Sequence, residues 1–401
     1  MRRSQVVSVL AAAAVIVGSV TVGAQESRNQ RKSTVVIPQE VLMELQRIAR
    51  EAFGEIQFGD LSRDLTRAMQ DLSRELGHFA GPGFADGVIM QNRDFRAEQT
   101  DKQTKTLAIG ASGSLELRNV VGDITVKAGS GREATVEIVR VSRGRTDADA
   151  KQGLARVTAE VSTRGDRGSV IAEYPDERRP NYAVSVAMTV TAPAGTQLNV
   201  ISITGDVTVT GIKGETSINT TTGAIDVSQA SALTAAHTAT GKITIRDSQG
   251  DALDVGTMSG PVELSNVKAR RLEVSGVTAM VSARNMQARE AEVTCMTGTI
   301  EYSGPVSAGG RYEFQSHNGE IHLALTGGFD FEGQTFNGQV EVDPAVGLKP
   351  QPNTERAGFG PRRQSVKGTV AGGGASVEAT TFGGHVRLVK TLPEMPKGRG
   401  R

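Results

Sequence analysis

The stretch Thr204-Gly205-Asp206-Val207-Thr208-Val209 decides the fold, because the chain repeats it. It returns at residues 222–227 and 240–245 as a hydroxyl residue, a glycine and two alternating aliphatic residues, and then more loosely at glycines 260, 298, 319 and 338. Successive glycines are 18, 18, 19, 38, 21 and 19 residues apart, and the interval of 38 predicts a degraded copy around Ser275-Gly276. Seven copies of one phrase indicate a repeat protein.

Each period contains a second strand-like phrase about halfway along. Examples are Leu272-Glu273-Val274-Ser275, Ala291-Glu292-Val293-Thr294 and Tyr312-Glu313-Phe314-Gln315. A unit of about 19 residues with two strands cannot bury its apolar face alone, so neighbouring units must stack. Corresponding strands would then run parallel, about 4.8 Å apart. The predicted fold is all-β, a β-solenoid of parallel stacked coils of about 19 residues.

The stacking predicts which side chains lie on one another. Val207, Ile225, Ile243 and Val262 should form one inward row. The glycine of each phrase fits a turn, where a Cβ would restrict the backbone. The hydroxyl residues before these glycines should form a ladder of their own: Thr204, Thr222, Thr240 and Ser259.

Composition agrees with such a stack and excludes other classes. The 401 residues include 47 glycines, without the strict every-third spacing of collagen. Aromatic residues are scarce, with 11 Phe, 4 Tyr and no Trp, as expected for a narrow core of β-branched residues. Wholesale disorder is excluded, because the charge is balanced and Val, Ile and Leu are frequent.

The N-terminus has the pattern of a secretory signal. Two arginines precede an apolar run that ends at Val22-Gly23-Ala24, with small or β-branched residues at the cleavage positions. The sequence predicts a signal peptide over residues 1–24. An uncleaved membrane anchor is the alternative, although the run is short for the roughly 20 residues that span a bilayer. We therefore expect an exported protein, periplasmic, extracellular or on the cell surface.

Charge and cysteine content limit the expected partners. Signal cleavage would leave 43 basic and 44 acidic residues, so the chain has no long-range attraction to nucleic acid or an anionic membrane. No second stretch is apolar enough to span a bilayer, and no membrane span is expected after cleavage. Cys295 is the one cysteine in the sequence, so an intrachain disulfide is excluded. Because it lies in a strand phrase, we predict that it is a small residue of the core.

The chain divides into further segments outside the repeats. Within residues 25–104, helical spacing over 38–77 predicts two amphipathic helices, followed by a linker. These helices either dock a partner or a second copy, or cap the next domain. Alternation over 105–203 predicts an N-terminal strand-rich section with one helical turn at 146–152. The remaining predicted segments are the repeats at 204–343, an irregular excursion at 344–367, closing strands within 368–392 (376–380 and 385–389) and a basic tail at 393–401.

Six aromatic residues gather between residues 302 and 336. They form either a ligand-binding patch or the filling of wider coils, and the inward strand phase of several favours the core. These residues are Tyr302, Tyr312, Phe314, Phe329, Phe331 and Phe336.

The order of motifs resembles a known bacterial family. Leu115-Glu116-Leu117 and Gly122-Asp123-Ile124-Thr125-Val126 come first, residues 190–198 then read Val-Thr-Ala-Pro-Ala-Gly-Thr-Gln-Leu, and the Thr-Gly repeats follow. This order resembles the domain of unknown function described as a putative adhesin with β-strand repeats, over roughly residues 107–345. The resemblance implies a secreted or envelope-facing β-solenoid. It does not extend to residues 38–77.

Motifs for catalysis or metal binding are missing from the sequence. There is no Gly-x-Ser-x-Gly, His-Glu-x-x-His, P-loop or dinucleotide-binding glycine pattern, so we predict no catalytic, cofactor-binding or metal-binding residues and no cofactor. Asp247, Asp251 and Asp254 suggest a calcium-binding turn, but their spacing matches no known loop and a solvated turn is the simpler interpretation. His317 and His322 have an odd offset, which places them on opposite faces of one strand. The other histidines are His78, His237 and His385.

Outward carboxylates are the remaining candidates for chemistry. Neighbouring coils could place two of them at the roughly 5–9.5 Å separation that glycosidases use. Sugar subsites commonly use aromatic platforms, however, and a solvated charged face is the simpler interpretation. The acidic stripe would consist of Asp226, Glu263, Glu301, Glu320 and Glu341.

Three functional hypotheses follow from these patterns. The first is a non-enzymatic exported β-solenoid, adhesin-like or envelope-associated, that presents a binding or scaffold surface to an envelope or cell-surface component. The second is a polysaccharide lyase or hydrolase that uses the acidic stripe. The third is an envelope sensor or scaffold that docks a partner, or self-associates, through residues 38–77.

Overall fold

The computed structural model describes residues 95–175, 180–351 and 364–392. The chain divides into two units, Met1–Glu75 and Leu76–Arg401, and all described residues belong to the second. The predicted signal peptide, the helices at 38–77 and the basic tail at 393–401 lie outside the described residues.

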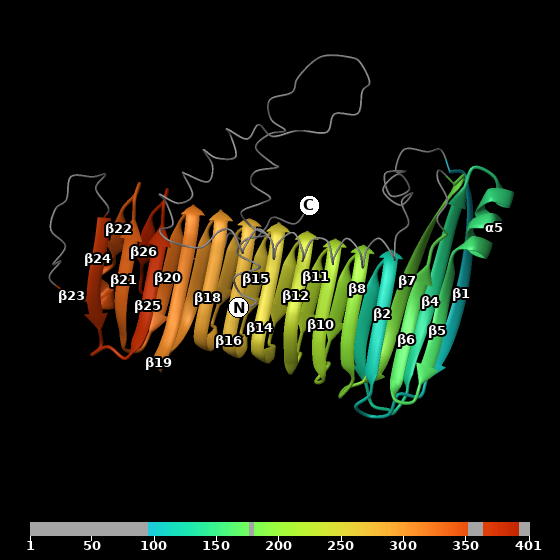
Figure 1. Cartoon of the computed structure of the whole chain (residues 1–401), viewed down its shortest axis with the longest axis horizontal. Coiled ribbons are helices and arrows are strands. Elements are labelled where there is room, and N and C mark those ends of the chain that lie inside the picture. Colours follow the sequence, from blue (N-terminus) through green and yellow to red (C-terminus); the bar gives the residue numbers. More distant parts are fainter. Residues whose placement is uncertain (1–94, 176–179, 352–363, 393–401) are drawn as a thin grey trace, which may run out of the picture. The chain divides into compact units, whose positions relative to one another are not determined.

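Two β-sheets share one hydrophobic core, and the long strand β19 (Ile300–Asn318) belongs first to one sheet and then to the other (Figure 1). Sheet A consists, in stack order, of β1 (Ala97–Leu107), β4 (Ala134–Gly144), β7 (Tyr182–Pro193), β3 (Ile124–Gly129), β9 (Val207–Thr210), β11 (Ile225–Ser228), β13 (Ile243–Arg246), β15 (Val262–Ser265), β17 (Val281–Arg284), the start of β19, β20 (Ile321–Thr326), β26 (Val386–Leu388) and β22 (Val340–Val342). Sheet B consists of β5 (Thr158–Arg164), β6 (Arg167–Glu173), β2 (Ser114–Val121), β8 (Gln197–Thr204), β10 (Glu215–Thr222), β12 (Ala232–Thr240), β14 (Gln249–Ser259), β16 (Lys268–Thr278), β18 (Gln287–Thr297), the end of β19, β25 (Ala375–Thr381), β21 (Phe329–Thr335), β24 (Gln364–Val370) and β23 (Lys349–Pro350).

The repeats build a solenoid-like stack in which a short sheet A strand alternates with a longer sheet B strand. Corresponding strands pair in parallel, and Val207, Ile225, Ile243 and Val262 lie opposite one another and are fully buried. The predicted inward row is therefore confirmed. The predicted hydroxyl residues also align in register, at the edge of sheet B next to the glycine turns.

A row of glycines forms one edge of the stack because neighbouring turns approach each other closely there. Gly223 has a φ of +148°, and a Cβ built on it would lie 2.0 Å from the carbonyl oxygen of Gly205 in the preceding coil. Gly241 has the same relation to Gly223, with a φ of +157°. The positive φ disfavours a residue with a side chain, and the neighbouring carbonyl oxygen leaves no room for a Cβ. The repeated glycine is thus a requirement of stacking as well as of turning.

The degraded repeat lies at a different place from the one expected. We predicted it around Ser275-Gly276, but Ser275 and Gly276 lie inside β16, and Ala279 occupies the glycine position beside Gly298. Ala279 is absent from the residues with positive φ, unlike Gly298 with a φ of +136°. The turn therefore accepts an alanine by changing its backbone conformation.

The opposite turn of three consecutive coils uses Asp or Asn instead. Asp247, Asn266 and Asn285 have φ between 50° and 54°, the left-handed region that Asn and Asp adopt more readily than other non-glycine residues. The Asn266 amide donates to Asp247 Oδ1 at 2.8 Å, and the Asn285 amide donates to Asn266 Oδ1 at 2.7 Å. Side-chain hydrogen bonds thus connect successive coils along this edge.

The order of coils in the stack departs from chain order near both ends. The coil of β2 and β3 lies between β6–β7 and β8–β9, and the coil of β25 and β26 lies between β19–β20 and β21–β22. In Figure 1, teal β2 accordingly lies between green strands and red β25 between orange ones. The prediction that strands at 376–380 and 385–389 close the stack was wrong. They form an internal coil, because β21 and β22 pair on their far side.

One helix, α5 (Asp147–Arg156), packs beside β1, β4 and β7. It begins with a capping box, in which the Thr146 hydroxyl accepts from the Asp149 backbone N–H and the Asp149 side chain accepts from the Thr146 backbone N–H. Thr146–Gln152 was predicted as a single turn, and the helix is longer. No helix within the described residues is long and apolar enough to cross a bilayer. The predicted excursion contains a short 3-10 helix (Pro344–Val346), β23 and the start of β24.

The aromatic group at 302–336 belongs mainly to the core. Five of its six members have exposed fractions of 2% or less: Tyr302, Tyr312, Phe314, Phe329 and Phe331. Phe336 is half-buried and packs against the exposed ring of Phe382, which stacks on His317. Rings that fill wider coils therefore account for most of this group. Cys295 is also buried, which confirms its prediction as a core residue.

Candidate binding face on sheet B

The acidic stripe predicted from the sequence lies on the outer face of sheet A, and it is not continuous. Asp226, Glu263, Glu301 and Glu341 occupy one register position, but other residues separate them. Glu320 lies in the turn before β20 instead. The intervening residues are Thr244, Ser282, His322 and Arg387.

Cations neutralise these sheet A carboxylates. The closest nitrogen–oxygen distances are 2.5 Å for Arg246–Asp226, 2.7 Å for Lys242–Glu263, 2.8 Å for Arg284–Glu301, 2.9 Å for Arg387–Glu341 and 3.4 Å for Arg387–Glu320. Alternating charge of this kind keeps an exposed sheet soluble. The sequence prediction of a solvated charged face agrees with these pairs, whereas a continuous acidic stripe does not.

An uninterrupted line of carboxylates lies on the outer face of the other sheet. We call it the carboxylate row, and it places six acidic residues opposite one another on consecutive strands of sheet B. Parallel strands are about 4.8 Å apart, so each carboxylate has like charges as its direct neighbours. In stack order the row consists of Asp254, Glu273, Glu292, Glu313, Glu378 and Glu332.

The row holds its central carboxyls in an unfavourable electrostatic position. Partial burial, followed by the charges of Asp254 and Glu292, raises the pKa of Glu273 to about 7. Partial burial and the charge of Glu313 also raise the pKa of Glu292, and burial with the charges of Glu313 and Glu332 raises that of Glu378. Like charges directly opposite in a sheet destabilise it. Arg271, Arg311 and Lys367 form ion pairs with Glu292, Glu313 and Glu332. The raised pKa of Glu273 nevertheless means that ionising this carboxyl costs folding stability.

Sequence reasoning missed this row although part of its signal was visible. Glu273, Glu292 and Glu313 occupy the same place in three strand phrases, at intervals of 19 and 21 residues. Glu378 and Glu332 could not be found in this way, because their strands enter the stack out of chain order.

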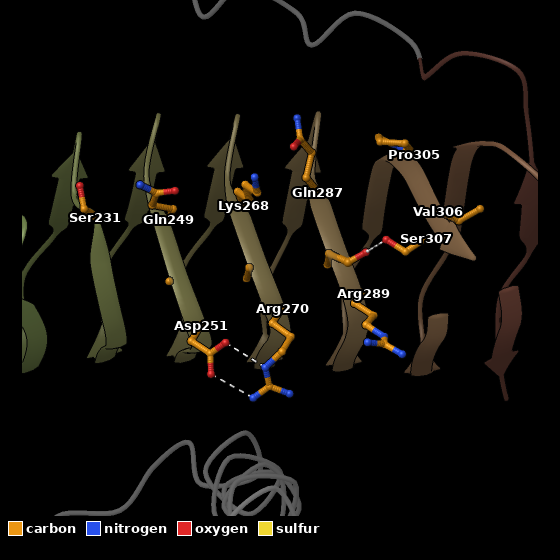
Figure 2. A pocket seen from close by; sticks show the side chains of 13 residues that line it. Ser231, Gln249, Asp251, Lys268, Arg270, Gln287, Arg289, Pro305, Val306 and Ser307 are labelled. Atoms are coloured by element: carbon orange, nitrogen blue, oxygen red, sulfur yellow. Dashed lines mark hydrogen bonds and ion pairs between the residues drawn. The ribbon is translucent and has the colours of Figure 1, made fainter. Parts of the chain in front are cut away.

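A shallow groove of about 570 Å³ crosses the same strands near the start of each of β14, β16 and β18 (Figure 2). Its floor is made of small residues in register, Gly250, Ala269 and Ala288. Figure 2 shows two rows of longer side chains from β14, β16 and β18 on either side of that floor. One row consists of Gln249, Lys268 and Gln287, and the other of Asp251, Arg270 and Arg289.

The groove carries an excess of positive charge. Arg270 donates from Nε and Nη2 to the two oxygens of Asp251, at 2.8 and 3.0 Å, and this hydrogen bonding lowers the pKa of Asp251. Lys268 and Arg289 are exposed, and no carboxylate among the described residues forms an ion pair with either. The lining thus holds three cations and one anion that is already paired.

A comparison with family models identifies the fold. The model described as Toastrack DUF4097 matches residues 100–358, which is more than half of the chain. The chain belongs to the Toastrack DUF4097 family. This membership confirms the resemblance to a family of domains of unknown function. The search of curated proteins finds no match.

Three solved structures are similar to this Toastrack chain at low identity. A putative lipid binding protein from Parabacteroides distasonis is 13% identical, with a TM-score of 0.40, over 72% of this chain and 97% of that one. A putative adhesin from Bacteroides fragilis is 9% identical, with a TM-score of 0.34 and the same coverages. A putative cell adhesion protein from Clostridium sporogenes is 8% identical, with a TM-score of 0.22, over 72% and 99%. These names describe those proteins, and no function is transferred from them.

The Toastrack fold separates the three aspartates that suggested a calcium turn. Asp247 accepts from Asn266 at the turn, Asp251 pairs with Arg270, and Asp254 lies 3.1 Å from His237 Nε2 on the outer face of sheet B. Within the described ranges, no three His, Cys, Asp or Glu residues are grouped so that they could hold a metal ion.

The remaining histidines and the cysteine have separate surroundings. His322 contacts Glu320, His317 stacks on Phe382, and His385 Nδ1 accepts from the Gln339 N–H at 3.2 Å. His78 lies outside the described residues. Burial raises the pKa of the Cys295 thiol, whose sulfur faces backbone carbonyls, so it lacks the features of a reactive cysteine.

Proposed function

We propose that this Toastrack protein is a non-enzymatic, exported binding module whose working surface is the outer face of sheet B. That face would meet a component of the cell envelope or the surface of another cell. The observation that carries the proposal is the groove, which lies in a rigid sheet and presents side chains in register on consecutive strands.

The geometry of the sheet supports binding of an extended ligand. Polar side chains recur about every 4.8 Å along the stack, so a ligand lying along it would meet a polar contact from each strand. Paired strands hold these side chains in place before binding, which lowers the entropy cost of association. The carboxylate row supports the proposal too, because its like charges lie together at a cost in stability.

A polysaccharide-cleaving enzyme is less well supported. The outward carboxylates first considered for it are ion-paired on sheet A, and Glu320 lies off their line. If purified protein released new reducing ends from a panel of acidic polysaccharides, the non-enzymatic part of the proposal would be overturned.

The binding surface can be tested in living cells with a photo-crosslinking residue. It would be placed at Ser217 or Thr294 on the outer face of sheet B, or at Thr125 or Thr208 on the outer face of sheet A as matched controls. We expect irradiation to attach an envelope component at the sheet B positions alone. Equal capture from both sheets, or capture from neither, would contradict the proposed surface.

Export and the role of the N-terminal helices need separate measurements. Cell fractionation should place the tagged protein in the envelope or outside the cell, with its signal removed. Recovery of uncleaved protein in the cytoplasm would end the export proposal. Docking through residues 38–77 stays a prediction: their deletion should abolish co-purification of a partner, and unchanged co-purification would refute it.

A further inference from the structure

The groove on sheet B has the dimensions of a site for a chain molecule. Its two side-chain rows come from three consecutive strands, β14, β16 and β18, and its lining extends to Ser231 on one side and to Pro305–Ser307 in β19 on the other (Figure 2). The groove therefore crosses the strands and follows the axis of the stack. A compact small molecule would use only part of it.

The positive charge of the groove indicates that the bound polymer is anionic. Lys268 and Arg289 lie on opposite sides of the floor and, within the described residues, form no ion pair with a carboxylate, whereas Asp251 already accepts two hydrogen bonds from Arg270. Glu290, which follows Arg289, lies in register between Arg271 and Arg311. Binding an anion would give Lys268 and Arg289 the charged partners that they lack.

The carboxylate row would confine an anionic chain to the groove. Asp254, Glu273 and Glu292 lie on the same three strands, three residues beyond the charged side of the groove. An anion that spread across the face would meet these carboxylates and be repelled. The basic groove and the carboxylate row together therefore leave an anionic chain one favourable path, along the groove.

The uncharged lining favours a hydroxyl-rich polymer. The amides of Gln249 and Gln287 offer both donors and acceptors, and Ser231 and Ser307 add hydroxyls. Among the residues that the structure describes, no aromatic side chain lines the groove, whereas sites for single-stranded nucleic acid use aromatic rings to stack bases. We infer that the groove binds an extended anionic polysaccharide, held by Lys268 and Arg289 at its acidic groups and by the glutamine amides at its hydroxyls. This inference rests on the proposed function of the sheet B face.

The test is calorimetric titration of the purified full-length protein with polygalacturonate as the probe. We expect binding that weakens as salt rises, and none to neutral dextran. The double variant Lys268→Gln/Arg289→Gln should raise the Kd at least about tenfold, because it removes two charge-assisted contacts. Lys127→Gln/Arg132→Gln removes the same charge from exposed positions within β3 and just beyond it, and should leave the Kd unchanged.

Several outcomes would overturn the inference. These are no binding of polygalacturonate, an equal loss in both double variants, or tighter binding of single-stranded DNA or anionic lipid vesicles that also depends on Lys268 and Arg289. If polygalacturonate does not bind while a photo-crosslinking residue at position 294 still captures an envelope component, the polysaccharide is the wrong ligand class and the proposed function is retained. If polygalacturonate binds but the cross-linking experiment captures nothing, the proposal that sheet B is the binding surface in cells would be refuted.

Discussion

At the scale of single residues, the fold depends on turn positions that have no room for a side chain. Gly223 combines a positive φ with a carbonyl oxygen 2.0 Å from the position of a Cβ. A side chain at this position therefore requires a change in the backbone of the turn. At Ala279 the backbone has changed and the side chain fits, with an exposed fraction of 4%.

We therefore predict that Gly223→Ala destabilises the protein by about 2 kcal/mol or more, since it adds backbone strain to a steric clash. The midpoint of urea unfolding, followed by circular dichroism, measures the loss. Gly131→Ala is the matched control, because its Cβ would have no neighbour closer than 3.8 Å, and it should change stability by less than about 1 kcal/mol. Equal losses in both variants would contradict a steric role for the glycine row.

At the scale of elements, pairing of neighbouring strands creates properties that no single strand has. Glu273 is an outward residue of β16, and its pKa is raised first by its partial burial in the sheet and then by the charges of Asp254 on β14 and Glu292 on β18. The sheet A carboxylates at one register position alternate with other residues and form ion pairs, for example Glu263 with Lys242 and Glu301 with Arg284. The uninterrupted row of like charges is therefore a property of sheet B pairing.

A pH dependence of stability follows from Glu273. Its pKa is about 7 in the folded protein against 4.5 as its ordinary value, so the folded state holds a proton that the unfolded state releases. Stability should consequently fall as pH rises from about 4.5 through about 7. Glu273→Gln should reduce this fall and be more stable than the natural protein at pH 8, as measured by urea midpoints at pH 5 and pH 8.

The control for this prediction is Glu263→Gln on sheet A, whose carboxylate lies 2.7 Å from Lys242. It changes the charge equally but breaks a favourable pair, so it should give no gain in stability at pH 8. A gain in both variants would point to net charge, and a gain in neither would contradict the strain assigned to the carboxylate row.

At the scale of the whole molecule, the stack is completed by segments that return to it from elsewhere in the chain. The coil of β25 and β26 pairs with β19 and β20 on one side and with β21 and β22 on the other. Its removal would leave β22 without a strand partner and separate β21 from the stack. The C-terminal part of the protein should therefore fold as one unit.

A truncation tests this dependence. A chain ending at Gly374 lacks β25 and β26, and we expect limited proteolysis to cut residues 320–370 at least about tenfold faster than in the intact protein, because the exposed strands open more often. A chain ending at Leu392 keeps both strands and should be cut at the original rate. Similar cleavage of the two truncated forms would show that β21 and β22 are stable without the inserted coil.

The sequence by itself determined the repeating part of this protein. Consecutive repeats are enough to predict three features: the period of about 19 residues, the inward row from Val207 to Val262, and the glycine turn. Local alternation and spacing are enough to predict them, because consecutive coils of the repeats are also adjacent in the stack.

Tertiary structure alone decided the order of coils at the two ends and the composition of the candidate site. The carboxylate row includes Glu378 before Glu332, and the groove depends on the register of Gly250, Ala269 and Ala288 between two polar rows. Both result from pairing between strands that are distant in sequence or irregular in register. Such pairing is determined by burial and backbone hydrogen bonding over the whole stack, and no local pattern of residues carries it.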